Sequence, residues 1–508
     1  MRTLVVLVLL AGCGDNSVAP ERCDPPVVTP VLPTEGHLID PLAIALPADC
    51  VEGGLADIAG RWFVVNPTEL FDFGYPAFAG TCETGFARVH DQDDDYDPSG
   101  DGFTRHTWSD GTRVFTRSSF TFDLGPDGIF EFTTATAACM RPDGTLASVV
   151  AHFDSDRGET VSPQTGTRFD VKDNAASGLE QVGEVAAAGL APIVGYNVVV
   201  DGTIAVVVGP AGMFTIDVAD PTVPAVLGFF EGEFNDVRVV RGGGKIVAYL
   251  APIRNENTQF VDITDPAHPA FAGVIPEYSH SVQVATVGAA THLYLATYTD
   301  QVPRYDVTNP LVPVRLGAAT VPGEAAGVHD LTVDGDRLLV NNTTAGFVAI
   351  DVASGLAVAT EVGRIPTSYS HASFAGTLTS GRRVILHGDE GMTGTSDLGA
   401  FLRIIDGDPA SPAFMHELAR YQSRPEVGIH NIELVGDRVY LSYYQDGIRI
   451  VDIADPTQPR EVAHYNTWDP ATASGDAFEG AVGVRVVDGL IYVADIARGL
   501  IILRETAP

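Results

Sequence analysis

The sequence predicts an all-β protein in which a seven-bladed β-propeller of four-stranded blades follows a small antiparallel β domain. Three observations predict this fold class. A short phrase returns with a nearly constant period, each period holds four strand-like segments, and apolar residues nowhere keep a helical period for three turns. The 53 Gly and 33 Pro among 508 residues supply the frequent turns that short strands need.

The recurring phrase appears as FTIDVADPTVP and again as QFVDITDPAHP. The Asp that ends its apolar run returns at spacings of 45, 44, 45, 55 and 46 residues, at Asp217, Asp262, Asp306, Asp351, Asp406 and Asp452. A period near 45 with four strands per period indicates propeller blades. In Asp-Pro-x-x-Pro the Asp accepts from amides two residues on and each Pro removes a donor, which predicts a turn and not a catalytic site.

The last copy, GLIILR at 499–504, ends the chain before a fourth strand can follow. Residues Leu179–Val185, LEQVGEV, match the fourth strands of other copies in type and position. We therefore predict that this segment pairs with 499–503 and closes the ring without an open edge.

Ile450-Val451-Asp452-Ile453 is close to the phrase that gives the LVIVD-repeat family its name, and the copies over 179–503 resemble that family. The resemblance implies a β-propeller on an exported or surface-displayed protein. It implies no particular activity, because the family has no single established reaction.

We predict that residues 38–176 form the small antiparallel domain. In this region, turn signals such as Pro142-Asp143-Gly144 separate runs rich in β-branched and aromatic residues. Gly60-Arg61-Trp62 is similar to the Gly-x-Trp start of lipocalin-type barrels. A barrel and a small sandwich both fit this pattern.

The excess of acidic side chains limits the classes of binding partner that the protein can have. With 66 acidic and 30 basic side chains the formal net charge is −36, which repels phosphate backbones and excludes nucleic acid as a partner. The same charge repels an anionic membrane surface, so attachment to a membrane needs another device.

The first residues, MRTLVVLVLLAGC, contain a signal for membrane attachment. The apolar run is too short to span a bilayer and fits a signal peptide over 1–12. Leu10-Ala11-Gly12-Cys13 resembles the lipobox of bacterial lipoproteins, which implies acylation of Cys13 and an anchor in the bacterial cell envelope. Gly14, and not an Asp, follows Cys13, and the resemblance to lipoproteins then implies sorting to the outer membrane, facing the periplasm or the surface. The Pro-rich segment 13–37 is predicted to be a tether. An ordinary signal peptide with an incidental Cys is the alternative.

An exported chain forms disulfides. Four cysteines remain after Cys13, and two disulfides with three possible pairings are predicted among Cys23, Cys50, Cys82 and Cys139.

Four periods place a histidine just before their first strand, where propeller strands begin near the central channel. Neutral imidazole is a good metal ligand, and neighbouring carboxylates would orient or ligate. The candidate channel or metal residues are His280, His329, His371, His430, Asp236 and Asp330. The structural alternative is a histidine that hydrogen-bonds inside its own blade, as in WD-repeat propellers.

Two acidic segments are candidate cation loops, for Ca²⁺ or another divalent ion. One is the insertion around His387, Asp389 and Glu390, and the other contains Asp97 and Asp101, which imitate the start of an EF-hand loop but lack its final Glu. Solvated loops are the alternative for both, and no other cofactor is predicted.

The chain carries no Gly-x-Ser-x-Gly elbow, P-loop or dinucleotide fingerprint. We therefore predict a monomeric, lipid-anchored, non-enzymatic propeller that displays a binding surface for protein or glycan. The alternative is a metal-dependent hydrolase or lyase that uses a His-lined central channel.

Overall fold

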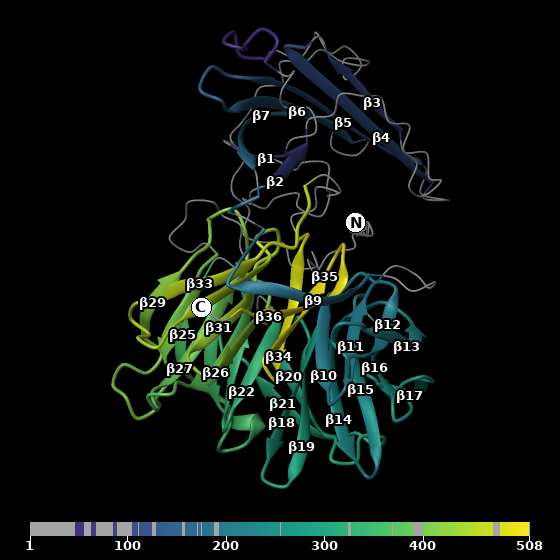
Figure 1. Ribbon diagram of the computed structural model, residues 1–508, viewed down its shortest axis with the longest axis vertical. Helices are drawn as coiled ribbons and strands as arrows, with labels where there is room; N and C mark the ends of the chain where they lie inside the picture. Colours follow the sequence, from purple (N-terminus) through teal and green to yellow (C-terminus); the bar gives the residue numbers. More distant parts are fainter. Residues whose placement is uncertain are drawn as a thin grey trace. The chain divides into compact units, whose positions relative to one another are not determined.

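The structure is a computed structural model, shown in Figure 1. It describes residues 46–54, 62–67, 85–88, 104–109, 111–123, 129–154, 158–169, 171–173, 175–186, 193–254, 256–323, 327–367, 369–390, 400–470 and 478–506. The described residues divide into two compact units, an N-terminal unit within 46–169 and a propeller unit that spans 171–469 and 478–506. Among them, no helix has the length and apolar character needed to span a bilayer.

The N-terminal unit contains one seven-stranded antiparallel sheet with the order β2-β1-β7-β6-β5-β4-β3. Its strands are β1 (Trp62–Pro67), β2 (Gly85–Arg88), β3 (Thr104–Ser109), β4 (Arg113–Asp123), β5 (Ile129–Met140), β6 (Leu146–Asp154) and β7 (Gly158–Phe169). Strands β3 to β7 form the antiparallel meander that the turn signals predict. The strands described in this unit make a single open sheet, neither a closed barrel nor two layers.

A disulfide joins Cys50 to Cys139, which is fully buried on β5. This disulfide belongs to one of the three predicted pairings, the one in which Cys23 pairs with Cys82. Both of those residues, like Cys13, lie outside the described residues, so the second disulfide stays a prediction.

The propeller unit consists of seven antiparallel sheets, the predicted number. In Figure 1 they follow one another from teal through green to yellow. The first blade contains β10 (Asn197–Asp201), β11 (Ile204–Gly209), β12 (Gly212–Asp217) and β13 (Ala225–Glu231), and the second contains β14 (Phe234–Gly242), β15 (Lys245–Pro252), β16 (Thr258–Asp262) and β17 (Ala270–Ile275). The third contains β18 (Ser281–Val287), β19 (Ala290–Ala296), β20 (Gln301–Asp306) and β21 (Val314–Thr320). The fourth contains β22 (Asp330–Asp334), β23 (Arg337–Asn341), β24 (Phe347–Asp351) and β25 (Thr360–Ile365), with the 3-10 turn η4 (Leu356–Val358) before β25.

The last three blades complete the set. They are β26 (Ser370–Thr377), β27 (Arg383–Asp389), β28 (Leu402–Asp406) and β29 (Glu417–Tyr421); β30 (Ile432–Val435), β31 (Arg438–Ser442), β32 (Ile448–Asp452) and β33 (Arg460–Tyr465), to which β8 (Ala176–Ser177) adds a fifth strand; and β34 (Ala481–Val487), β35 (Leu490–Asp495), β36 (Gly499–Glu505) and β9 (Leu179–Val185).

The ring closes as the sequence predicts. Strand β9 pairs antiparallel with β36, from Leu500 opposite Val185 to Glu505 opposite Leu179. The first strands of successive blades are neighbours in the order β10, β14, β18, β22, β26, β30, β34 and back to β10. The strand that precedes the first blade in sequence therefore completes the last blade.

The recurring phrase folds through hydrogen bonds within a few residues. In each of the six copies the Asp that ends the third strand accepts from the amide two residues on, at 2.8–3.0 Å. The Asp or Asn of each Asp-Pro or Asn-Pro step repeats this turn, for example from Thr222 N to Asp220 Oδ1 at 3.0 Å. The predicted turn role of Asp-Pro-x-x-Pro is therefore confirmed.

The fourth strand of every blade joins its sheet through a register shift one or two residues before that Asp or its counterpart Arg504. The extra residue bends the strand and increases its twist. At two of these shifts a glycine lies beneath the Pro turn of the next blade. A Cβ on Gly183 would lie 2.1 Å from Pro221 O, and one on Gly228 would lie 2.4 Å from Pro266 O. Only glycine allows this close contact between blades.

Candidate functional site

The four predicted histidines lie side by side in the propeller unit, one from each of four consecutive blades. Their exposed fractions are 2–5%, and successive rings from His280 through His329 and His371 to His430 have centroids 4.2, 4.3 and 4.4 Å apart. The residues come from the start of the first strands β18, β22, β26 and β30, so the repeat itself sets their spacing. We call these four residues the histidine arc.

Two members of the histidine arc hydrogen-bond to the next blade and not inside their own. His371 Nδ1 lies 2.8 Å from His430 O, and His430 Nδ1 lies 3.0 Å from Val482 O. A carbonyl oxygen only accepts, so each Nδ1 carries the proton and each neutral ring keeps its lone pair on Nε2. For these residues the predicted alternative of a lock within one blade is therefore wrong.

His280 is bound differently. The Asn235 side-chain amide lies 3.0 Å from His280 Nε2 and also donates to His280 O at 3.0 Å. Its ring is therefore held by the preceding blade, and its Nε2 lone pair is already engaged.

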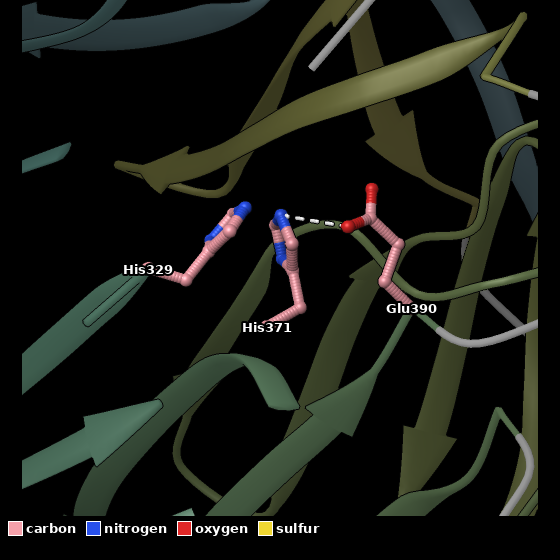
Figure 2. Close-up of side chains that lie close together, drawn as sticks. All are labelled: His329, His371 and Glu390. Carbon is pink, nitrogen blue, oxygen red and sulfur yellow. Dashed lines mark ion pairs between the residues drawn. The ribbon is translucent and has the colours of Figure 1, made fainter. Parts of the chain in front are cut away.

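Glu390 completes a cluster with the histidine arc. Its Oε2 lies 3.5 Å from His371 Nε2, and one ligand atom each of His329, His371 and Glu390 lie within 4.8 Å of one another (Figure 2). All three residues are buried. The Tyr444 hydroxyl donates a short hydrogen bond to Glu390 Oε1, which fixes the carboxylate.

The insertion site expected for a cation is not assembled as one group. His387 Nε2 bonds to Ser370 Oγ at 2.9 Å and its ring packs on Phe347, while Asp389 accepts from Tyr369 N at 2.9 Å. Both lie on β27, a buried strand, and not in a solvated loop. Of the three predicted residues, only Glu390 reaches the histidine arc.

Asp236 and Asp330 bind the blades together beside the histidine arc. The Ser281 hydroxyl lies 3.1 Å from Asp236 Oδ2 and 2.6 Å from Asp330 Oδ1, and Asp236 also accepts from Val282 N at 2.9 Å. Burial and the nearby Asp236 carboxylate raise the pKa of Asp330 to about 6. These contacts describe a network between neighbouring first strands and not a direct contact with the imidazoles.

The histidine arc is electrically neutral at neutral pH. Burial lowers the pKa of His280 and that of His430 to about 3. Burial and the neighbouring imidazoles lower the pKa values of His329 and His371 well below the ordinary value. Neutral imidazole is the form that ligates metals.

Aromatic rings from strained turns cover the histidine arc. Tyr298 packs on His280 at 4.5 Å and on His329 at 5.3 Å, and Tyr444 packs on His430 at 5.5 Å. Tyr298 and Tyr444, and Thr343 at the matching place in the fourth blade, have positive φ angles of 53°, 36° and 40°. Such strain in non-Gly residues costs about 1–3 kcal/mol each and gathers at functional sites.

Sequence reasoning did not find the part played by Glu390 or Tyr444. The available signal for Glu390 was the apolar run Val384–Leu386 in RVILHGDE, because reading this segment as a strand puts Glu390 on the face opposite His387 and Asp389. The other predicted loop, with Asp97 and Asp101, lies outside the described residues and stays a prediction.

Comparison with known proteins identifies the repeat. The family model of the LVIVD repeat matches residues 429–467. A search of curated proteins finds no match.

Solved structures similar to the chain have low identity. Raptor of Chaetomium thermophilum is 9% identical with a TM-score of 0.46, and the match covers 65% of this chain and 29% of Raptor. The WD40 β-propeller domain of Doa1 is 10% identical with a TM-score of 0.44, covering 65% of this chain and 98% of that one. BamB from Moraxella catarrhalis is 11% identical with a TM-score of 0.38, covering 79% and 100%.

The propeller assignment rests on the strand pairing and not on these matches. Six sheets of four strands and one of five have first strands that form a closed cycle, and the repeat-family match spans β30 to β33 of the sixth blade. The chain is a seven-bladed β-propeller that contains an LVIVD repeat.

Proposed function

We propose that this chain is a lipid-anchored interaction propeller of the bacterial cell envelope, which binds a protein through the outer strands of its first four blades. The observation that supports the proposal is that exposed apolar side chains are concentrated on these outer strands. Of the twelve large apolar side chains found exposed where the structure describes side-chain exposure, nine lie on β13, β17, β21 and β25 or on the turns leading into them. These nine, the apolar rim, are Val223, Leu227, Phe271, Val274, Val312, Val314, Leu316, Val358 and Val362.

The apolar rim has the features of a protein-binding surface. Its side chains are mostly aliphatic, which suits a protein better than a glycan. Each of the four sheets ends at its outer strand, so backbone groups at that edge are available for pairing with an added strand. The outer strand of the sixth blade, β33, differs because β8 already pairs with it.

The anchor is supported by the N-terminal sequence. MRTLVVLVLLAGC has the features of a lipoprotein signal, and acyl chains hold a protein to a bilayer by about 0.8 kcal/mol for each buried methylene. With a net charge of −36 the protein itself has no electrostatic attraction to anionic lipid.

A Cys13→Ser protein should move from the membrane fraction to the soluble fraction, because the acceptor for the acyl chains is lost. Cys23→Ser, ten residues further along the tether, is the matched control and should stay with the membrane. Cell fractionation followed by immunoblotting measures both. Retention of the Cys13→Ser protein in the membrane would contradict lipid anchoring.

A photo-crosslinking residue placed at Phe271 or at Leu316 should capture one discrete protein in intact cells, because both positions lie on the apolar rim. Arg420, exposed on the outer strand of the fifth blade, is the matched control position and should not capture it. Replacing Val314 by Glu should remove the adduct by placing a charge in the contact. Equal capture from Arg420, or no protein adduct from the rim positions, would refute the docking surface and favour a glycan or no partner there.

A further inference from the structure

We propose that His329, His371 and Glu390 form a binding site for one divalent transition-metal ion, of the zinc type, at the inner ends of the fourth and fifth blades. This site lies on the histidine arc and is separate from the apolar rim. The interaction surface does not use these residues.

The spacing of the ligand atoms fits a metal ion better than a hydrogen bond. His371 Nε2 and Glu390 Oε2 are 3.5 Å apart, longer than the ordinary range for a hydrogen bond between nitrogen and oxygen. Two ligands that each lie about 2.0–2.1 Å from a tetrahedral zinc ion are separated by roughly 3.3–3.4 Å. The third residue, His329, supplies an atom within 4.8 Å of both (Figure 2).

The hydrogen bond at His371 Nδ1 turns the other ring nitrogen toward Glu390. Because His371 donates Nδ1–H to His430 O, the Nε2 lone pair of the neutral ring points toward the Glu390 carboxylate. Two electron-pair donors that face each other in a buried space repel unless a proton or a metal ion lies between them. A metal ion between His371 Nε2 and Glu390 Oε2 would accept both lone pairs and remove that repulsion.

The remaining imidazole nitrogens support the same conclusion. Within the part of the chain that the structure describes, no hydrogen bond is made to His371 Nε2, to His430 Nε2 or to either ring nitrogen of His329. Burying a polar group without a partner is unfavourable. His329 is 2% exposed, and coordination of one of its nitrogens would offset that cost.

The surrounding contacts orient the ligands as in protein metal sites. A ligating histidine almost always donates its other N–H to a carbonyl or carboxylate, and ligating carboxylates are themselves hydrogen-bonded. His371 meets the first condition through His430 O, and Glu390 meets the second through the Tyr444 hydroxyl. The strained turn at Tyr444 therefore has a function, because it presents that hydroxyl to the carboxylate.

The ligand set selects the class of ion. Two imidazoles and one carboxylate suit zinc and its neighbours in the first transition row, whereas Ca²⁺ and Mg²⁺ require oxygen ligands. Three protein ligands leave a fourth position for His430 Nε2, the next ring of the arc, or for a water molecule. The burial of all three residues favours an ion that the protein retains.

The test titrates Zn²⁺ into the full-length protein after removal of metals by a chelator, with isothermal calorimetry and elemental analysis as readouts. The parent should bind one Zn²⁺ per chain and gain thermal stability, and Ca²⁺ and Mg²⁺ should not compete. Glu390→Gln and His371→Ala should each weaken Zn²⁺ binding by at least about 100-fold, more than loss of an outer-shell partner does. His268→Ala is the matched control, because His268 lies on the surface beside Asp265, and it should bind as the parent does.

Glu390→Gln keeps the test decisive if His371→Ala does not fold. The Gln carbonyl still accepts from Tyr444, and its amide donates to His371 Nε2, so the metal-free variant should unfold at the same temperature as the metal-free parent or above it. Less than one Zn²⁺ per parent chain, unchanged affinity in Glu390→Gln, or equal loss in His268→Ala would overturn the site. A lower unfolding temperature of metal-free Glu390→Gln would also overturn it, because His371 Nε2 would then not be an open lone pair.

Discussion

An Arg449→Leu protein should lose about 2–3 kcal/mol of the free energy of unfolding of the propeller, because a buried guanidinium that donates to charged, partly exposed acceptors is removed. Arg449 lies on β32 with a side chain that is 0% exposed. Its guanidinium donates to Asp173 Oδ2 at 2.8 Å, to Glu461 Oε1 at 3.2 Å and to Asn466 Oδ1 at 3.1 Å. Leucine would remove these hydrogen bonds and leave only Lys172, 3.9 Å from Asp173 and 4.0 Å from Glu461, beside the two carboxylates.

The charges around Arg449 show why the pair must stay intact. Burial alone would lower the pKa of the Arg449 guanidinium, but Asp446, Asp173 and Glu461 raise it above the ordinary value. Asp446 is itself fully buried and pairs with Arg424 at 2.5 Å. Arg449, Arg424 and Lys172 therefore lie among these three carboxylates, and of the three cations Arg449 has the most deeply buried side chain.

Chemical denaturation compares Arg449→Leu with a surface control, Arg420→Leu. Arg420 pairs with Glu417 but is 40% exposed, so its loss should change the free energy of unfolding by less than about 1 kcal/mol. A loss in Arg449→Leu no larger than that in the control would show that the buried network does not stabilise the blade.

A Leu179→Asp protein should lose at least about 4 kcal/mol of the free energy of unfolding, because packing is lost and a carboxylate enters an apolar core. Leu179 begins β9 and is 5% exposed. It packs in a cluster with Ile448 and Ile450 of the sixth blade and Leu503 of the seventh. One side chain thus connects the strand that closes the ring to both blades beside it.

The ring could be predicted from the sequence because its information is local and repeated. Each Asp phrase forms its own turns within a few residues, so six copies give six blades without knowledge of distant contacts. The seventh blade followed from counting, since 499–504 lacked a fourth strand and Leu179–Val185 had the matching pattern. The fifth strand β8 was not predicted, because two residues carry no pattern.

The candidate site was predicted only in part. The histidine positions follow from the repeat, so their alignment was visible in the sequence. The approach of Glu390 to His371 was not, because it depends on the side-chain direction at the end of β27, which the sequence reading had assigned to a loop. Arg449 was missed for another reason, because its partner Asp173 lies 276 residues away in the sequence.

Thermal and chemical unfolding of Leu179→Asp beside Glu180→Gln tests the closed ring most directly. Glu180 is the next residue on β9, and its pairing with Arg504 at 3.5 Å involves two exposed side chains, so the Gln variant should match the parent within about 0.5 kcal/mol. The closed ring predicts a large loss in Leu179→Asp alone. Equal stability of the parent and both variants would mean that β9 does not complete the seventh blade, and that the blades, with the histidine arc at their inner ends, are not held in a ring.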